Sequence, residues 1–223
     1  MKSALVMASG AVVSACTTRG VNTLAQLPPA PIPVPVPVAS PPPEMARRRP
    51  TAPRGIRQDL FEKAVASLDR HSMTIPSHDR IAIADFSQPS HLPRFHIVNM
   101  GNGQVESLLV AHGSGSDPEH TGVLHSFSNE MGSNATCEGS FVTSDYYSGR
   151  HGASQRLLGL DPTNNNALDR AIVVHGAWYS NPDMIEKWGK LGRSQGCFAV
   201  GEADLERLFL RLGQGRMIYS AKV

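Results

Sequence analysis

Cysteine is scarce in this 223-residue chain, which contains only Cys16, Cys137 and Cys197. Three cysteines cannot all pair within one chain, so at least one of them must be free or modified. The sequence therefore excludes a scaffold in which every cysteine is held in an internal disulfide bond, and each cysteine needs its own explanation.

An excess of charge of one sign is also missing. The chain has 21 Lys and Arg residues against 19 Asp and Glu residues, which gives a formal net charge of +2 with neutral histidines. This balance indicates no strong nucleic-acid-binding patch, so we expect no nucleic-acid partner.

The motifs of zinc peptidases are absent as well. The sequence has nine histidines, but none lies in an HExxH or HxxEH pattern. A zinc peptidase is therefore disfavoured, and we expect the protein to use neither a metal ion nor an organic cofactor.

The apolar run at the start of the chain is short. Residues 1–15 carry one positive side chain, Lys2, followed by apolar and small residues. Such a run cannot cross a bilayer as a helix and is typical of an export signal. It ends in Val13-Ser14-Ala15-Cys16, which resembles a bacterial lipobox, so we predict a lipoprotein with a membrane anchor on Cys16. The alternative is an ordinary signal peptide cleaved near residue 25, and both interpretations predict a protein of the periplasm or cell envelope.

Proline is concentrated in the next segment. Eleven of the 17 prolines lie between residues 27 and 53, and residues 31–38 alternate Pro with Ile or Val. This pattern favours extended polyproline II, which rises about 3.1 Å per residue. We therefore predict a disordered, proline-rich linker over residues 16–54 that acts as a spacer, with a ligand for another domain as the alternative. One folded domain over residues 55–223 would follow.

Short strand patterns dominate this folded part. Apolar or alternating runs predict strands at residues 81–86, 94–99, 105–111, 141–143, 157–160, 171–174 and 216–221. Helical periodicity is limited to residues 56–71, 203–212 and a short stretch within 178–190. Residues 113–134 are rich in Gly, Ser, Asp and His and predict a long loop. We therefore expect a mainly β domain, sandwich-like or barrel-like, with a few short peripheral helices.

A histidine and a cysteine in the last third of the chain suggest a thiol nucleophile and its base. The apolar run 171–174 delivers His175-Gly176, and Cys197 follows 22 residues after the histidine. An imidazole within hydrogen-bond reach can take the thiol proton or hold the thiolate as an ion pair. The alternatives are that Cys197 is a small buried hydrophobic residue and that His175 is a satisfied polar residue.

Residues beside the cysteine could assist this chemistry. Gly196 lets the backbone bend so that main-chain N–H groups point at an oxyanion. Arg193 supplies a positive charge that could favour the thiolate or hold a substrate carboxylate. Ser194 could hydrogen-bond within the loop.

The pair His175-Gly176 with Gly192-Arg193-Ser194-Gln195-Gly196-Cys197 resembles the catalytic signature of the L,D-transpeptidases, whose domain is of the YkuD type. Residues 139–170 resemble the segment before the catalytic histidine in one branch of this family, and the similarity covers about residues 85–219. The commoner pattern is Ser/Thr-His-Gly-Cys, whereas Gln195 stands at the second place here, as in a branch with a Ser-x-Gly-Cys motif. His175 is then the one base that the motif offers.

The resemblance implies a YkuD-type fold and a cysteine acyltransferase that acts on donor and acceptor stem peptides of peptidoglycan. It implies Cys197 as the nucleophile, His175 as the base, and acylation of Cys197 by carbapenems. Because Cys197 must be available as a thiolate, we predict that Cys137 is free.

Further roles are assigned by the same resemblance. The oxyanion loop consists of Ser194, Gln195, Gly196 and Gly176. The substrate-binding candidates are Arg193, Tyr147, Arg150 and His151. For the segment around Tyr147, the alternative is a tyrosine packed on the sheet beside a capped turn.

These observations predict a peptidoglycan L,D-transpeptidase that forms cross-links between stem peptides through a thioester on Cys197. The first alternative is an L,D-carboxypeptidase or hydrolase, in which water takes the same thioester. The second is a non-catalytic, wall-binding lipoprotein, which the presence of both His175 and Cys197 disfavours. Nothing in the sequence decides between an amine and water as the acceptor.

Overall fold

The computed structural model describes residues 50–223, which contain an eight-stranded β-sheet. The predicted export signal, the lipidation site Cys16 and the linker up to residue 49 lie outside the described residues and stay predictions. Within the described part, no helix combines the length and the apolar character needed to cross a membrane.

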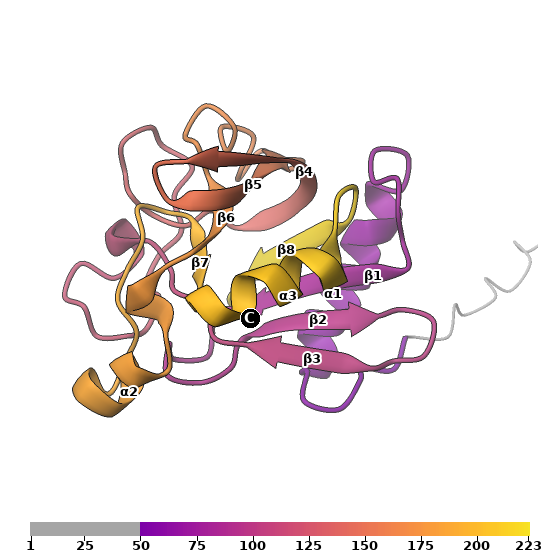
Figure 1. Cartoon of the computed structure of the whole chain (residues 1–223). Coiled ribbons are helices and arrows are strands. Elements are labelled where there is room, and N and C mark those ends of the chain that lie inside the picture. Colours follow the sequence, from indigo (N-terminus) through magenta and orange to yellow (C-terminus); the bar gives the residue numbers. More distant parts are fainter. Residues whose placement is uncertain (1–49) are drawn as a thin grey trace, which may run out of the picture. The chain divides into compact units, whose positions relative to one another are not determined.

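The strands pair in one continuous ladder in the order β3-β2-β1-β8-β4-β5-β6-β7 (Figure 1). Their bounds are β1 Arg80–Asp85, β2 Phe95–Asn99, β3 Val105–Leu108, β4 Gly139–Gly149, β5 Gly152–Gly159, β6 Val173–Gly176, β7 Phe198–Val200 and β8 Met217–Ala221. The β1–β8 and β6–β7 pairs are parallel, and the other five pairs are antiparallel. The mainly β prediction is confirmed, and the strands form a single sheet.

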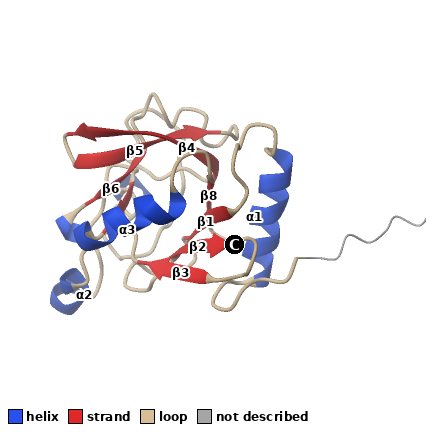
Figure 2. Cartoon of the chain, turned by 45° about the vertical axis from the view of Figure 1, so that its right-hand side comes forward, coloured by secondary structure: helices blue, strands red, loops and turns tan. Residues whose placement is uncertain are grey.

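Three short α-helices accompany the sheet, as expected. They are α1 Gln58–Arg70, α2 Asp183–Trp188 and α3 Glu202–Leu212. α1 contacts β1, β4 and β8, whereas α3 contacts β1 and β6, and the two helices lie on opposite sides of the central strands (Figure 2). The sheet is therefore covered on both faces near its middle.

The residues of β1 alternate between two hydrophobic cores. Ile81 and Ile83 belong to the core that α1 covers, and Ala82 and Ala84 belong to the core that includes Leu208 of α3. Successive side chains of a strand point to opposite faces, so one strand can serve both layers. Burial of apolar surface stabilises a fold by about 25 cal/mol per Å². The two cores thus fix the platform on which the candidate site is built.

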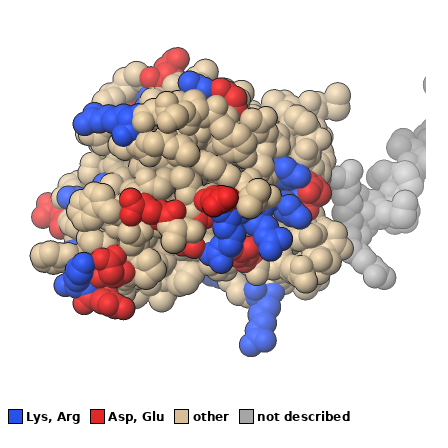
Figure 3. Space-filling model, in the orientation of Figure 1, with Lys and Arg blue, Asp and Glu red and all other residues tan. Residues whose placement is uncertain are grey.

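Charged groups also join α3 to the sheet. Arg207 and Arg211 lie 2.9 and 3.4 Å from the two carboxylate oxygens of Glu106 on β3. Figure 3 shows side chains of both signs close together over α3 and the β2–β3 hairpin. Exposed ion pairs contribute about 0–1 kcal/mol each. The buried side chains Leu208 and Leu212 therefore hold this helix more firmly than its charges do.

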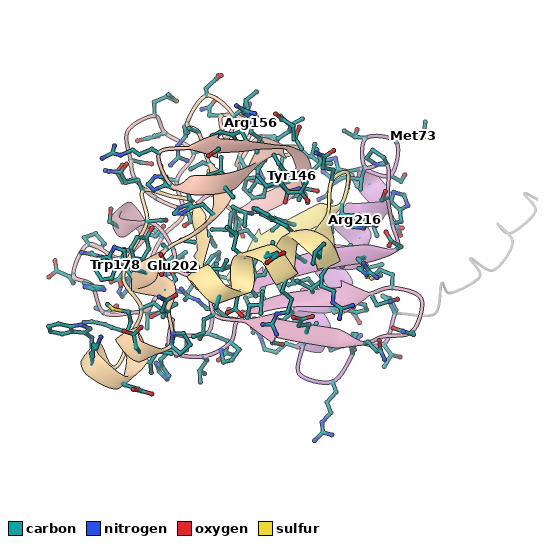
Figure 4. The ribbon with its side chains drawn as sticks, in the orientation of Figure 1. Met73, Tyr146, Arg156, Trp178, Glu202 and Arg216 are labelled. Carbon is teal, nitrogen blue, oxygen red and sulfur yellow. The ribbon has the colours of Figure 1, made fainter. Side chains whose placement is uncertain are left out.

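One long hairpin replaces the two short strands expected at residues 141–143 and 157–160. β4 and β5 remain paired up to Gly149 and Gly152, which leaves a two-residue turn. Figure 4 shows this hairpin lying above α3. Its far half is largely exposed, so it lacks the apolar alternation that marks a strand in a sequence.

The segment between β3 and β4 has little regular structure. The strand expected over residues 105–111 ends at Leu108, and the predicted loop contains one 3-10 turn, Ser114–Ser116. This loop approaches the cysteine-bearing segment closely. A β-carbon added to Gly113 would lie 2.2 Å from the carbonyl oxygen of Asn134 and 2.7 Å from the α-carbon of Gly196. Only glycine fits between these two backbones.

We expect Gly113→Ala to lower the free energy of unfolding by about 1–3 kcal/mol, because an extra methyl group in a full space forces the backbone to move. Urea unfolding followed by circular dichroism measures the change. Gly101→Ala is the matched control, since its β-carbon would meet no atom closer than 3.4 Å. Equal unfolding midpoints for the two variants would contradict the close approach.

Candidate active site

The parallel pairing of β6 and β7 brings the predicted nucleophile and base to one side of the sheet. His175 faces Ala199 across the two strands. Cys197 precedes Ala199 by two residues, and side chains two apart on an extended chain share a face. Cys197 is a bend residue directly before β7, and it lines the same pocket as His175. Phe198, between Cys197 and Ala199, points the other way into the hydrophobic core.

Cys197 and His175 line a pocket of about 550 Å³. The other predicted site residues in its wall are Arg193, Gln195, Tyr147, Arg150 and His151. Ser194, Gly196 and Gly176 do not line it. The wall is completed by residues that the sequence analysis did not single out, chiefly Arg170 and Tyr179, and by part of the 131–134 loop. No local pattern distinguishes either of those two side chains from an ordinary surface residue.

His175 is buried and oriented by the backbone. Its Nδ1 lies 2.9 Å from the carbonyl oxygen of Gly176, and a carbonyl can only accept, so Nδ1 carries the proton. Nε2 is then left with a free lone pair. Burial lowers the pKa of His175, the bond to Gly176 opposes this, and the neighbouring His151 lowers it further. The imidazole is therefore neutral at pH 7 and can accept a proton.

Cys197 is also held in its neutral form. Its side chain is buried, and Sγ lies 3.5 Å from the carbonyl oxygen of Ala171. Burial raises the pKa of the Cys197 thiol, while the amide of Val173 and the charge of Arg170 act in the opposite direction. The thiol of Cys197 and the imidazole of His175 are therefore each favoured in the neutral form, rather than as a thiolate and an imidazolium.

The positive charge that acts on Cys197 does not come from Arg193, as the sequence suggested, but from Arg170. The guanidinium of Arg193 donates to the backbone carbonyl oxygens of Asp117 and of Pro118, the latter at 2.9 Å. These bonds fix it at the pocket wall. The positive charge that lowers the pKa of Cys197 comes instead from Arg170, which lies three residues before β6.

Arg170 links the cysteine region to the preceding loop. It donates to the carbonyl oxygens of Ser128 and Ala135, each at 2.6 Å, and its Nη1 lies 2.7 Å from Sγ of Cys137. Cys137 and Cys197 are both free, which confirms the prediction for Cys137. A disulfide between them would consume the candidate nucleophile, and none is present in the described part of the chain.

Ser194 and Gly196 shape the loop rather than the pocket surface. The hydroxyl of Ser194 donates to the carbonyl oxygen of Cys197 at 2.7 Å and accepts the amide N–H of Gly196 at 3.2 Å. Gly196 has φ +111°, a conformation that favours glycine. The Gly196 amide is thus occupied within the loop. Gly176 contributes its carbonyl oxygen to His175.

The turn of the β4–β5 hairpin closes one side of the pocket. The ring of His151 stacks on that of His175, with centroids 4.4 Å apart and planes 21° apart. The ring of Tyr147 lies under the guanidinium of Arg156 at 4.2 Å. Arg150 is exposed at the tip. The hairpin therefore places cationic, aromatic and imidazole groups next to the candidate base.

The family model of the L,D-transpeptidase catalytic domain matches residues 52–220. The chain belongs to the L,D-transpeptidase family. No protein with a curated description matches the chain.

Solved structures of L,D-transpeptidases are similar to this chain at low identity. An L,D-transpeptidase from Mycobacterium tuberculosis H37Rv is 15% identical, with a TM-score of 0.42 over 65% of this chain and 58% of that chain. One from Mycobacterium smegmatis is 13% identical, with a TM-score of 0.38 over 64% and 58%. One from Xylanimonas cellulosilytica is 16% identical, with a TM-score of 0.37 over 71% and 69%. The match thus spans less than two thirds of the two mycobacterial chains.

In this L,D-transpeptidase domain, residues 192–197, which we call the cysteine loop, lie against buried polar groups. The amide of Ser194 donates to the carbonyl oxygen of His112 at 2.9 Å. Arg94 lies 2.7 Å from Nδ1 of His112, whose Nε2 lies 3.3 Å from the carboxylate of Asp117. The side chains of Arg94, His112 and Asp117 are at most 1% exposed. The sequence analysis missed this network because arginine and aspartate usually mark a surface.

Each member of the network has a displaced pKa. Burial lowers the pKa of His112 to about 3, and the charge of Arg94 acts in the same direction. Burial would raise the pKa of Asp117, but hydrogen bonds from Thr121 and Gly122 outweigh it and bring the value to about 2. At neutral pH the imidazole is therefore uncharged between a cation and a carboxylate.

We expect acid to destabilise the L,D-transpeptidase domain partly through His112. Its folded pKa of about 3 lies below the ordinary histidine pKa of 6.5, so between these pH values the unfolded chain binds a proton that the folded chain does not. Stability then rises with pH by up to about 1.4 kcal/mol per pH unit for this group. His112→Gln should flatten the dependence measured by urea unfolding from pH 3.5 to 6.5. Exposed His91→Gln is the control, and an unchanged slope in His112→Gln would refute the assignment.

Alkylation of Cys197 should report its protonation state. Because burial raises the pKa of this thiol above its usual 9.0, the alkylation rate with iodoacetamide should still be rising above pH 9. Peptide mass mapping in a Cys137→Ser background measures the rate at Cys197 alone. A rate that levels off near neutral pH would instead indicate a resting thiolate–imidazolium pair.

Proposed function

We propose that this member of the L,D-transpeptidase family forms cross-links between peptidoglycan stem peptides through a thioester on Cys197. The observation that supports this most directly is the shared pocket. In it, a thiol and a neutral imidazole with a free Nε2 line one cavity beside the paired strands β6 and β7.

The first half of the proposed reaction forms the thioester. Sγ of Cys197 attacks the carbonyl carbon of an L,D peptide bond in the donor stem while Nε2 of His175 takes the thiol proton. Since the resting pair is neutral, this proton transfer accompanies the attack. The imidazolium then gives the proton to the departing amine, and the donor acyl group remains on sulfur.

The second half transfers the acyl group. An acceptor amine attacks the thioester, His175 receives a proton from it, and the sulfur leaves to be reprotonated as the thiol. Water in place of the amine would make the enzyme a carboxypeptidase. The two outcomes differ in the acceptor alone, so the mass of the product distinguishes them.

The pocket wall suits a flexible peptide that carries charges. Arg150 and Arg193 provide cationic groups, and Tyr147 and His151 provide ring surfaces. Because Arg193 is held by two backbone carbonyl oxygens, its remaining N–H groups have a defined direction for a stem-peptide carboxylate. These four residues are our proposed substrate contacts.

We expect Cys197→Ala to abolish turnover of muropeptides and His175→Ala to lower it by about 10²–10⁴-fold, because the variants lack the nucleophile and the base. Liquid chromatography with mass detection identifies dimers as cross-links and shortened stems as hydrolysis products. A chelator should leave the parent rate unchanged. Turnover that survives Cys197→Ala but fails with chelator would indicate a metal enzyme. Binding of muropeptides without turnover by the parent would indicate a wall-binding module.

A further inference from the structure

The backbone of the cysteine loop offers fewer oxyanion donors than its sequence predicts. The backbone amides next to the sulfur are those of Gln195, Gly196 and Cys197. The amide of Gly196 donates to Ser194 Oγ inside the loop, so it is not available to a ligand. The amides of Gln195 and Cys197 remain, and a side-chain donor in the pocket wall would act beside them on an oxyanion.

Tyr179 is built into the wall beside the cysteine loop. It belongs to the 3-10 turn Trp178–Ser180, which follows β6 directly, and its carbonyl oxygen accepts the amide of Gly192 at 2.7 Å. Its ring covers Gly192, where an added β-carbon would lie 2.5 Å from Tyr179 Cβ and 3.0 Å from Cγ. The loop and the tyrosine thus fit together because residue 192 has no side chain.

Tyr179 packs against a small apolar cluster. This cluster includes Ala111, Leu191 and Ala199, and Ala199 faces His175 across β6 and β7. The cluster therefore connects Tyr179 to the strands that flank the pocket. Trp178, by contrast, is 65% exposed and lies outside the pocket wall.

The phenol of Tyr179 is free to bind a ligand. Within residues 50–223 its hydroxyl makes no hydrogen bond, although the side chain is only partly exposed and lines the pocket with Cys197 and His175. Burial, together with the nearby Cys197, raises the pKa of Tyr179 to about 12. The hydroxyl thus keeps its proton at every pH at which the enzyme would work.

We propose that the hydroxyl of Tyr179 is the side-chain donor of the oxyanion site, where it hydrogen-bonds to the carbonyl oxygen of the bond that Cys197 attacks. This inference rests on the proposed function and adds a catalytic residue to it. The signature motifs around His175 and Cys197 do not contain this residue.

The step balances without transfer of the phenolic proton. The sulfur–carbon bond forms, the carbonyl π pair moves onto oxygen, and the thiol proton goes to Nε2 of His175. Tyr179 stabilises the negative oxygen through an O–H···O⁻ hydrogen bond. When the pair on oxygen returns, the carbon–nitrogen bond breaks, and the amine leaves with the proton from His175.

Tyr179→Phe removes this donor and keeps the ring that covers Gly192. We expect acylation of Cys197 by the carbapenem imipenem, followed by intact mass, to slow by about 100-fold, the usual effect of one oxyanion donor. Alkylation of Cys197 by iodoacetamide should keep the parent rate, because that displacement at a saturated carbon creates no oxyanion. Thermal unfolding of the variant should match that of the parent.

Tyr146→Phe is the matched control. Its hydroxyl lies 3.3 Å from the carbonyl oxygen of Phe209 on α3, outside the pocket of Cys197, so its acylation rate should equal that of the parent. A Tyr179→Phe variant that acylates at the parent rate would overturn the inference. Equal slowing of acylation and alkylation would do so too, since Tyr179 would then act on the thiol. A parent that imipenem does not acylate at Cys197 would overturn the proposed function itself.

Discussion

The pairing of two short parallel strands is the constraint on which the candidate site depends. β6 carries His175, β7 begins directly after Cys197, and the pairing of these strands brings both residues to one pocket. Parallel strands need a long connection, and the 21 residues between His175 and Cys197 supply it with a 3-10 turn, the short helix α2 and the cysteine loop. That connection also supplies three parts of the pocket wall, Tyr179, Arg193 and Gln195.

The segment between β3 and β4 supports the cysteine loop through hydrogen bonds. His112 and Asp117 offer backbone carbonyl oxygens to Ser194 and Arg193, while their side chains and Arg94 form the buried network behind the loop. A buried charge that loses its partner is costly, so such a network resists rearrangement. The position of the nucleophile is thus tied to groups far from it in the sequence.

The sequence predicted those features that depend on neighbouring residues in the chain. Strands, both longer helices and the grouping of Cys197 and His175 followed from periodicity and from a family signature. The far half of the β4–β5 hairpin was not predicted, because it is exposed to solvent and lacks the apolar alternation of a buried strand. Arg94, Arg170 and Tyr179 escaped because their roles depend on contacts across 16 to more than 40 residues, or on the absence of a side chain at Gly192. Such pairings arise from tertiary packing and leave no pattern in the chain.

The neutral resting state of the thiol and imidazole has a chemical consequence between turnovers. Oxidants such as hydrogen peroxide attack the thiolate, and low-pKa, accessible cysteines are the ones converted to sulfenic and higher acids. Burial raises the pKa of Cys197. It also limits access to the sulfur, because the residue is only 8% exposed. In the proposed reaction, the sulfur thereby stays reduced until a bound acyl donor draws the proton toward His175, so reactivity would coincide with the presence of substrate.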